Sequence, residues 1–163
     1  MRGLTHVFIG IGFVSLLLIL FKTPFILWGV GSFLISPIFS RLPDYDQKIA
    51  DITFNQIVPH RGKGTHNLLY SVPLILLVFI QDLPIIGSLL VMLVGSIFGA
   101  IFIHAFVDAF NYGGVWIGFL KTKGFLRWDS FWGNLFFKII GILLFLLSLL
   151  CYLDNPYMEI IYT

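Results

Sequence analysis

The residues of this chain that could do chemistry are four histidines and a few aspartates, which stand in short polar islands beside long apolar runs. The most informative pair is His104 and Asp108, four residues apart in an otherwise apolar stretch. On a helix this spacing places both side chains on one face, where an imidazole and a carboxylate can share a metal ion. An ionisable pair is costly at membrane depth unless it is compensated, and a bound cation is one compensation. The pair therefore indicates a metal site or, alternatively, a neutralised pair that holds helices together.

A second polar island follows the second apolar run. Asp44 and Asp46 flank Tyr45 directly after Pro43. An extended backbone here would turn both carboxylates to the same face, as a pair of metal ligands would require. The alternative for this island is a solvated loop or a helix cap.

A third island is the glycine-rich basic loop between His60 and His66. Its backbone could bring both imidazoles inward while Arg61 or Lys63 engages an anionic group. His6, at the start of the first apolar run, completes the set of histidines. The alternative is that the basic loop sets membrane topology or touches anionic lipid, and that a lone His6 is an ordinary interfacial residue.

The composition places these residues in a membrane protein. Of the 163 residues, 58% are hydrophobic and 11% are charged, with a mean hydropathy of +0.97. Because a membrane helix needs roughly 20 apolar residues, we predict an all-α, polytopic integral membrane protein with about four to five transmembrane helices. The apolar runs lie at about 4–21, 24–39, 68–80, 84–110 and 135–153, and the third run is short.

These runs also suggest how the chain is organised. We expect a single membrane-embedded domain over residues 1–163, with a polar site loop at about 41–66 and an interfacial segment at about 111–134, where aromatic and basic residues meet lipid headgroups. Gly95 and Gly99 of the fourth run have a small-xxx-small spacing that lets helices approach closely. The single cysteine, Cys151, excludes an intrachain disulfide and a cysteine-ligated zinc site.

Basic residues are distributed unevenly between the two faces that this threading creates. With five spans, one face receives Lys22 alone. The other face receives Arg2, Arg41, Lys48, Arg61, Lys63, Lys121, Lys123 and Arg127. Since basic loops are retained in the cytoplasm, we predict a cytoplasmic N-terminus and an external C-terminus. The histidines fall on the basic face, although they were not used to choose it, so we expect a cytoplasmic site.

The order of the motifs resembles a known family. The chain carries Thr5-His6, Leu42-Pro43-Asp44-Tyr45-Asp46, His60-Arg61-Gly62 with Thr65-His66, and His104-x-x-x-Asp108 before Gly113-Gly114-Val115. This ordered set resembles the YdjM-type membrane-bound metal-dependent hydrolases, which are bacterial and archaeal inner-membrane proteins also described as LexA-binding. The resemblance implies a prokaryotic cytoplasmic (inner) membrane location and a metal site built from these His and Asp residues. It also implies a distant similarity to zinc-dependent phospholipase C and the P1-type nucleases.

Together these observations predict a membrane-bound metal-dependent hydrolase that acts on a phosphate ester or lipid-linked substrate at the cytoplasmic membrane face. The candidate metal ligands are His6, Asp44, Asp46, His60, His66, His104 and Asp108. Imidazole and carboxylate ligands favour zinc, and they also suit manganese or iron. Asp46 or Asp108 would act as general base toward metal-bound water, and Arg61 would hold the anionic substrate. The expected partners are membrane lipid and this substrate, with no direct contact to nucleic acid.

Three other functions stay open at this stage. A small transporter or proton-coupled carrier would use His104 and Asp108 to relay ions. A non-catalytic membrane partner protein would need neither metal nor substrate, and facing histidines could bind haem. The sequence lacks a nucleotide-binding glycine-rich loop, a His-Glu-x-x-His helix and a Gly-x-Ser-x-Gly nucleophile.

Overall fold

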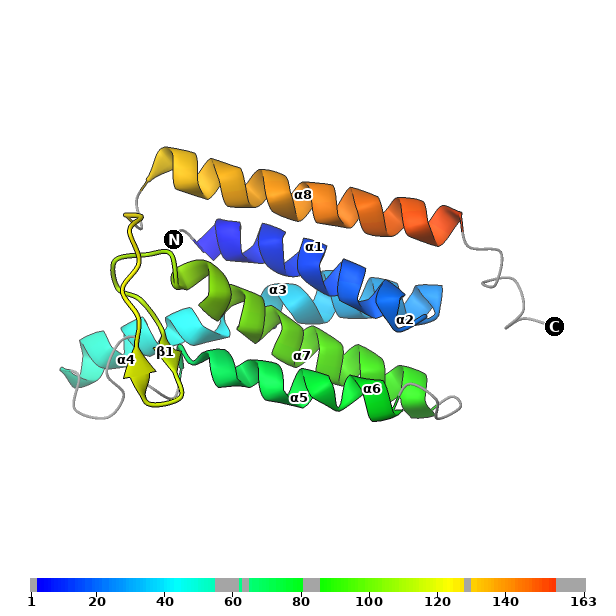
Figure 1. Cartoon of the computed structure of the whole chain (residues 1–163), viewed down its shortest axis with the longest axis horizontal. Coiled ribbons are helices and arrows are strands. Elements are labelled where there is room, and N and C mark those ends of the chain that lie inside the picture. The colour runs from blue at the N-terminus through cyan, green and yellow to red at the C-terminus, as the bar shows by residue number, and fades with distance from the viewer. Residues whose placement is uncertain (1–2, 55–61, 63–64, 81–85, 128–129, 155–163) are drawn as a thin grey trace.

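The body of the protein, in a computed structural model, is a bundle of long apolar helices (Figure 1). The structure describes residues 3–54, 62, 65–80, 86–127 and 130–154. Four helical segments there are long and apolar enough to cross a membrane: Gly3–Leu20, Phe25–Thr53, Ile86–Asp108 and Phe131–Leu153. A helix of 23 residues spans about 35 Å, against a hydrocarbon thickness of about 30 Å. The prediction of an all-α polytopic membrane protein is confirmed.

The first and last helices pack tightly against each other. Helix α1 covers Gly3–Leu20 and helix α8 covers Phe131–Leu153. At their crossing a Cβ atom on Gly12 would overlap the backbone of Gly141, so only glycine lets the two helices approach this closely. Helix α8 begins where the Ser130 hydroxyl accepts a hydrogen bond from the Gly133 N–H at 3.2 Å, a side-chain cap.

The second segment is a broken helix. It consists of α2 (Phe25–Gly29), the π-helix η1 (Val30–Ile35) and α3 (Ser36–Phe39). Pro37 stands in the first turn of α3 and has no N–H to donate to the preceding turn, which accounts for the loss of α geometry just before it. The chain then continues as the 3-10 helix η2 (Leu42–Asp44) and helix α4 (Tyr45–Thr53).

The prediction of an extended backbone around Asp44 and Asp46 is wrong, because both residues lie in this helical stretch. Pro43 suits the start of a helix as well as an extended chain, since an N–H in the first turn has no intrahelical partner. On a helix, residues two apart are rotated by roughly 200° from each other. The two carboxylates therefore point in different directions.

The short third run lies beside α7 (Ile86–Asp108) in Figure 1. It is divided into η3 (Leu68–Ser71), α5 (Val72–Ile75) and α6 (Leu77–Ile80), with Pro73 in the first turn of α5. A helix of this length spans about 20 Å, so it is shorter than the hydrocarbon layer. The start of α1 and the end of α8 lie at opposite ends of the bundle (Figure 1).

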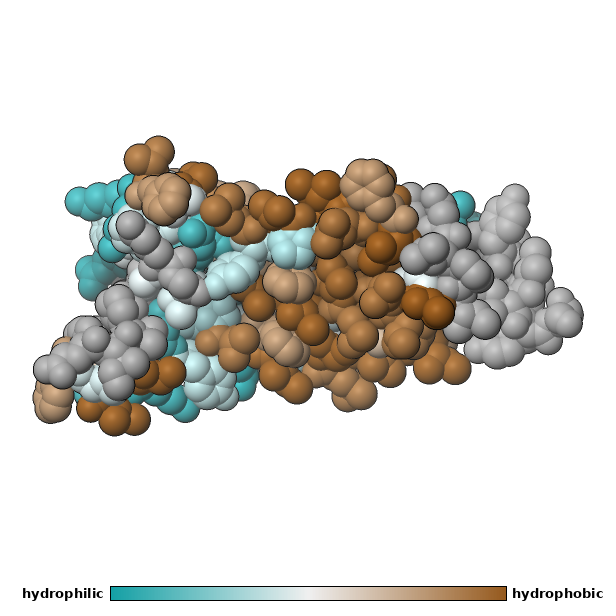
Figure 2. Space-filling model, turned by 90° about the horizontal axis from the view of Figure 1, so that it is seen from below, coloured by the Kyte–Doolittle hydropathy of each residue, from teal (hydrophilic) through white to brown (hydrophobic). Residues whose placement is uncertain are grey.

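The surface of the bundle is apolar along most of its length and polar at one end. Figure 2 shows hydrophobic residues over the middle of the visible face and hydrophilic residues at the end that carries α4. A small antiparallel hairpin, β1 (Trp116–Ile117) and β2 (Leu120–Lys121), lies at the same end (Figure 1). Its turn uses Gly118 with φ of +60°, a conformation that favours glycine. The interfacial position proposed for 111–134 stays a prediction, and Trp128 lies outside the described residues.

Candidate metal centre

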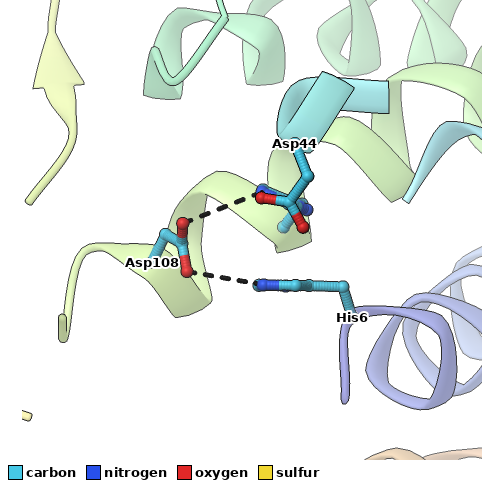
Figure 3. Close-up of side chains that lie close together, drawn as sticks. His6, Asp44 and Asp108 are labelled. Atoms are coloured by element: carbon cyan, nitrogen blue, oxygen red, sulfur yellow. Dashed lines mark ion pairs between the residues drawn. The ribbon is translucent and has the colours of Figure 1, made fainter. Parts of the chain in front are cut away.

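Four side chains from three parts of the chain meet at the polar end of the bundle. His6 lies in the first turns of α1, Asp44 ends η2, and His104 and Asp108 occupy the last turns of α7. One potential ligand atom from each of the four lies within 4.8 Å of all the others. Figure 3 shows His6, Asp44 and Asp108 pointing toward a common centre. We call these four residues the His/Asp cluster, and the group could hold a metal ion.

The distances within the His/Asp cluster fit ligands arranged around one ion. His6 Nε2 lies 3.5 Å from Asp108 Oδ1, and His104 Nε2 lies 3.5 Å from Asp44 Oδ1 and 3.8 Å from Asp108 Oδ2. These separations are longer than ordinary hydrogen bonds. Two ligand atoms in a tetrahedral zinc site, each about 2.1 Å from the metal, are about 3.4 Å apart. The cluster is therefore close to the spacing that a coordinated cation would require.

The orientation of His104 is fixed from outside the cluster. Its Nδ1 lies 2.6 Å from the backbone oxygen of Ser40, and a carbonyl only accepts hydrogen bonds. Nδ1 therefore carries the proton, and Nε2 presents a lone pair toward Asp44 and Asp108. A histidine ligand whose other nitrogen donates to a carbonyl is typical of metal sites in proteins.

His66 adjoins the His/Asp cluster as a further histidine. Its Nε2 lies 3.4 Å from His104 Nε2 and 3.4 Å from Asp108 Oδ2. Its Nδ1 lies 3.3 Å from Asp46 Oδ2, which also accepts a hydrogen bond from the Thr65 hydroxyl at 2.6 Å. Asp46 thus contacts the ring nitrogen of His66 that faces away from the His/Asp cluster, and it is not a member of the cluster.

The electrostatics around His66 favour a positive charge at this position. Burial alone would lower the pKa of His66, but hydrogen bonds to Asp108 and Asp46 outweigh it and raise the pKa above its ordinary value. A proton on His66 supplies positive charge beside two buried carboxylates. A metal ion among the same side chains would supply that charge instead.

His6 provides a second sign that a ligand belongs here. Its side chain is fully buried, and neither ring nitrogen has a hydrogen-bond partner within the described part of the chain. The ring stacks on His104 with centroids 3.8 Å apart. Burying a polar group without a partner costs about 1–3 kcal/mol. A cation bound by Nε2 would remove that cost for one of the two ring nitrogens.

Several residues that support the centre were missed in the sequence. Asn111 is 1% exposed and donates from Nδ2 to Asp108 Oδ1 at 2.6 Å. The N–H of Trp116 donates to the backbone oxygen of His66 at 2.7 Å, so the hairpin fixes the segment that carries this histidine. Helix α7 ends at Asp108, so Asn111 lies beyond the helix and helical spacing did not predict its contact. No feature of the sequence predicted the hydrogen bond between the hairpin residue Trp116 and the His66 backbone.

The structure thus brings together His6, Asp44, His66, His104 and Asp108. Asp46 lies behind His66, and general-base roles for Asp46 and Asp108 stay predictions. The predicted ligand His60 and the predicted substrate-binding residues Arg61 and Lys63 lie outside the described residues.

No family model, curated protein or solved structure matches this sequence. The resemblance to the YdjM-type hydrolases therefore stays a prediction.

Proposed function

We propose that this protein is a membrane-bound metal-dependent hydrolase that acts on a phosphate ester or lipid-linked substrate at the cytoplasmic membrane face. The observation that carries the proposal is the His/Asp cluster, in which ligand atoms from three segments lie within 4.8 Å of one another. Two features favour a bound metal ion over a purely structural polar contact. His6 is buried without a hydrogen-bond partner among the described residues, and the outer nitrogen of His104 donates to a carbonyl.

A divalent cation held by imidazole and carboxylate ligands supplies two kinds of chemistry: it acidifies a bound water and polarises a phosphoryl oxygen. Zinc is the metal that these ligands favour most, followed by manganese and iron. The ligands would be His6, Asp44, His104 and Asp108, with His66 as an additional candidate.

The four ligands differ in their access to solvent. The side chains of His6, His104 and Asp108 are fully buried, whereas that of Asp44 is 34% exposed. Substrate would therefore approach from the side of Asp44. Asp46 is 2% exposed and bonded by Thr65, so its expected role is to orient His66. Arg61 and Lys63 stay candidates for binding the anionic substrate.

The location in the prokaryotic inner membrane follows from the resemblance to the YdjM-type proteins together with the apolar helices. The cytoplasmic orientation follows from the basic residues. Arg41, Lys48 and Lys121 lie on segments at the end that carries the His/Asp cluster, while Lys22 follows α1 at the opposite end.

Metal content tests the proposal directly. The protein would be purified in detergent without affinity metals, and its metal would be measured by elemental mass spectrometry. We expect near-stoichiometric zinc, manganese or iron in the wild type, and its loss in His104→Ala and His66→Ala. Ser148→Ala is the control, because this buried hydroxyl bonds only locally, to the Phe145 carbonyl at 2.7 Å. Cleavage of phosphomonoesters and phosphodiesters would then be assayed with the metal-loaded wild type. A folded wild type without metal would contradict the proposal and favour the carrier.

A further inference from the structure

We infer that Arg41 and the first turn of α1 form a binding site for the phosphate group of the substrate, directly beside the His/Asp cluster. The inference rests on the proposed function and makes it more specific, because it selects phosphate esters over uncharged esters.

The backbone of Arg41 is held by the cluster on both sides. The preceding residue, Ser40, offers its carbonyl to His104 Nδ1 at 2.6 Å. The carbonyl of Arg41 itself accepts a hydrogen bond from the N–H of Asp44 at 3.0 Å. The backbone of Arg41 therefore lies between two hydrogen bonds that involve cluster residues.

The side chain of Arg41 reaches the start of α1. Its Nε lies 4.0 Å from the position that a Cβ atom on Gly3 would occupy. His6 follows Gly3 by three residues, so both lie on the same face of α1, one turn apart. The guanidinium group thus lies beside a residue that is one helical turn from His6, whose ring faces Asp108. Arg41 is exposed and makes no salt bridge within the part of the chain that the structure describes.

The chemistry of this position suits a phosphate anion. A guanidinium group forms paired hydrogen bonds to two phosphate oxygens. The first N–H groups of an α-helix have no intrahelical partner, and they attract anions through the helix dipole. Helix α1 has 18 residues and no acidic residue in its first turn. One turn further on, the buried His6 lacks a hydrogen-bond partner among the described residues, and its Nε2 faces Asp108 of the cluster at 3.5 Å. A phosphate group there would contact Arg41 on one side and face the cluster on the other.

Binding of inorganic phosphate tests the site without requiring the natural substrate. Affinity would be measured by calorimetry on metal-loaded full-length protein in detergent. We expect Arg41→Gln to weaken phosphate binding about 10- to 100-fold while its metal content stays at the wild-type level. Arg41→Lys should be weakened less, because it keeps the charge but loses the paired contact. The control is Lys48→Gln, which removes an exposed positive charge on α4 at the same end of the protein and should leave phosphate affinity unchanged.

The outcomes separate this inference from the proposed function. Unchanged phosphate affinity in both Arg41 variants would overturn the inference even if metal and hydrolysis are confirmed. If the wild type holds no metal, the proposed function fails. Phosphate binding that depends on Arg41 in that metal-free protein would then still support the phosphate site, and its absence would overturn it. A second titration, with short-chain phosphatidate in mixed micelles, shows whether the phosphate group belongs to a lipid headgroup or to a soluble ester. Tighter binding than inorganic phosphate that is lost in Arg41→Gln would identify a lipid headgroup, and equal binding would identify a soluble phosphate ester.

Discussion

The histidines of the metal centre are held in different ways. His104 is oriented by the Ser40 carbonyl and His66 by Asp46, so in each ring one nitrogen faces the protein and the other faces the cluster. His6 has no such outer partner among the described residues, and only burial and stacking on His104 fix its ring. Ligand geometry at this centre therefore depends on residues outside the cluster.

Asn111 is the residue through which this dependence can be measured. Its Nδ2 donates to Asp108 Oδ1 at 2.6 Å, and both residues are buried. Asn111→Ala removes the donor that orients this carboxylate, so we expect metal affinity to fall about 10- to 100-fold, as for other outer partners of metal ligands. Affinity would be measured by competition with a chromophoric chelator. The control Ser148→Ala should bind as tightly as the wild type, and an equal affinity for Asn111→Ala would show that Asp108 is oriented without it.

Sequence spacing predicted some members of the cluster correctly, but it could not show which of Asp44 and Asp46 belongs to the cluster. His104 and Asp108 could be predicted as a pair because both stand in one apolar helix with a fixed period. Asp44 and Asp46 could not be separated in the same way. Pro43 is compatible with helix and extended chain alike, and only the helix sends Asp44 to His104 and Asp46 to His66. Long-range contacts such as that of Asn67, whose amide donates to the Gly118 carbonyl at 3.2 Å, leave no trace in local sequence.

At the scale of elements, the apolar runs were predictable and their closest contacts were not. The small-residue spacing of α7 favoured close packing at Gly95 and Gly99. A Cβ atom on either would meet leucine side chains of α1 at 3.1–3.2 Å. The backbones approach most closely elsewhere, at Gly12 of α1 and Gly141 of α8. Because leucine side chains can shift and backbones cannot, the glycines of this crossing constrain the bundle more strongly.

The crossing of α1 and α8 gives a prediction about stability. A methyl group at Gly12 would overlap the backbone of Gly141, so the helices must separate to accommodate Gly12→Ala. We expect the free energy of unfolding to fall by about 1–3 kcal/mol, the usual cost of overpacking. Denaturant-induced unfolding in detergent, followed by circular dichroism, would measure it.

Gly29 is the matched control for this substitution. It is also a helical glycine, but no atom lies within 4 Å of the position that its Cβ would occupy. Gly29→Ala should therefore be neutral or stabilise the protein by up to about 1 kcal/mol through helix propensity. Equal effects of the two substitutions would show that the crossing of α1 and α8 is not tightly packed.

For the molecule as a whole, the important feature is that the candidate metal site and several basic residues lie at the same end of the bundle. The His/Asp cluster, α4 and the hairpin all lie there, and so do the segments that carry Arg41, Lys48 and Lys121. The opposite end of the bundle carries Lys22 and the end of α8. If basic residues hold the cluster end in the cytoplasm, Asp154 at the end of α8 must lie outside it.

Cysteine labelling in cells would test this orientation. Cys151→Ser gives a cysteine-free background, since the chain has a single cysteine. Two positions exposed at opposite ends are then replaced separately, Lys48→Cys on α4 and Asp154→Cys at the end of α8. We expect a membrane-impermeant maleimide to label Asp154→Cys in intact spheroplasts and Lys48→Cys only after permeabilisation. The reverse pattern would place the cluster on the outer face, so a substrate would have to reach it from outside the cytoplasm. Labelling of both variants in intact spheroplasts would mean that the membrane does not separate the two ends. The long apolar helices would then not span the membrane, although they are long enough to do so.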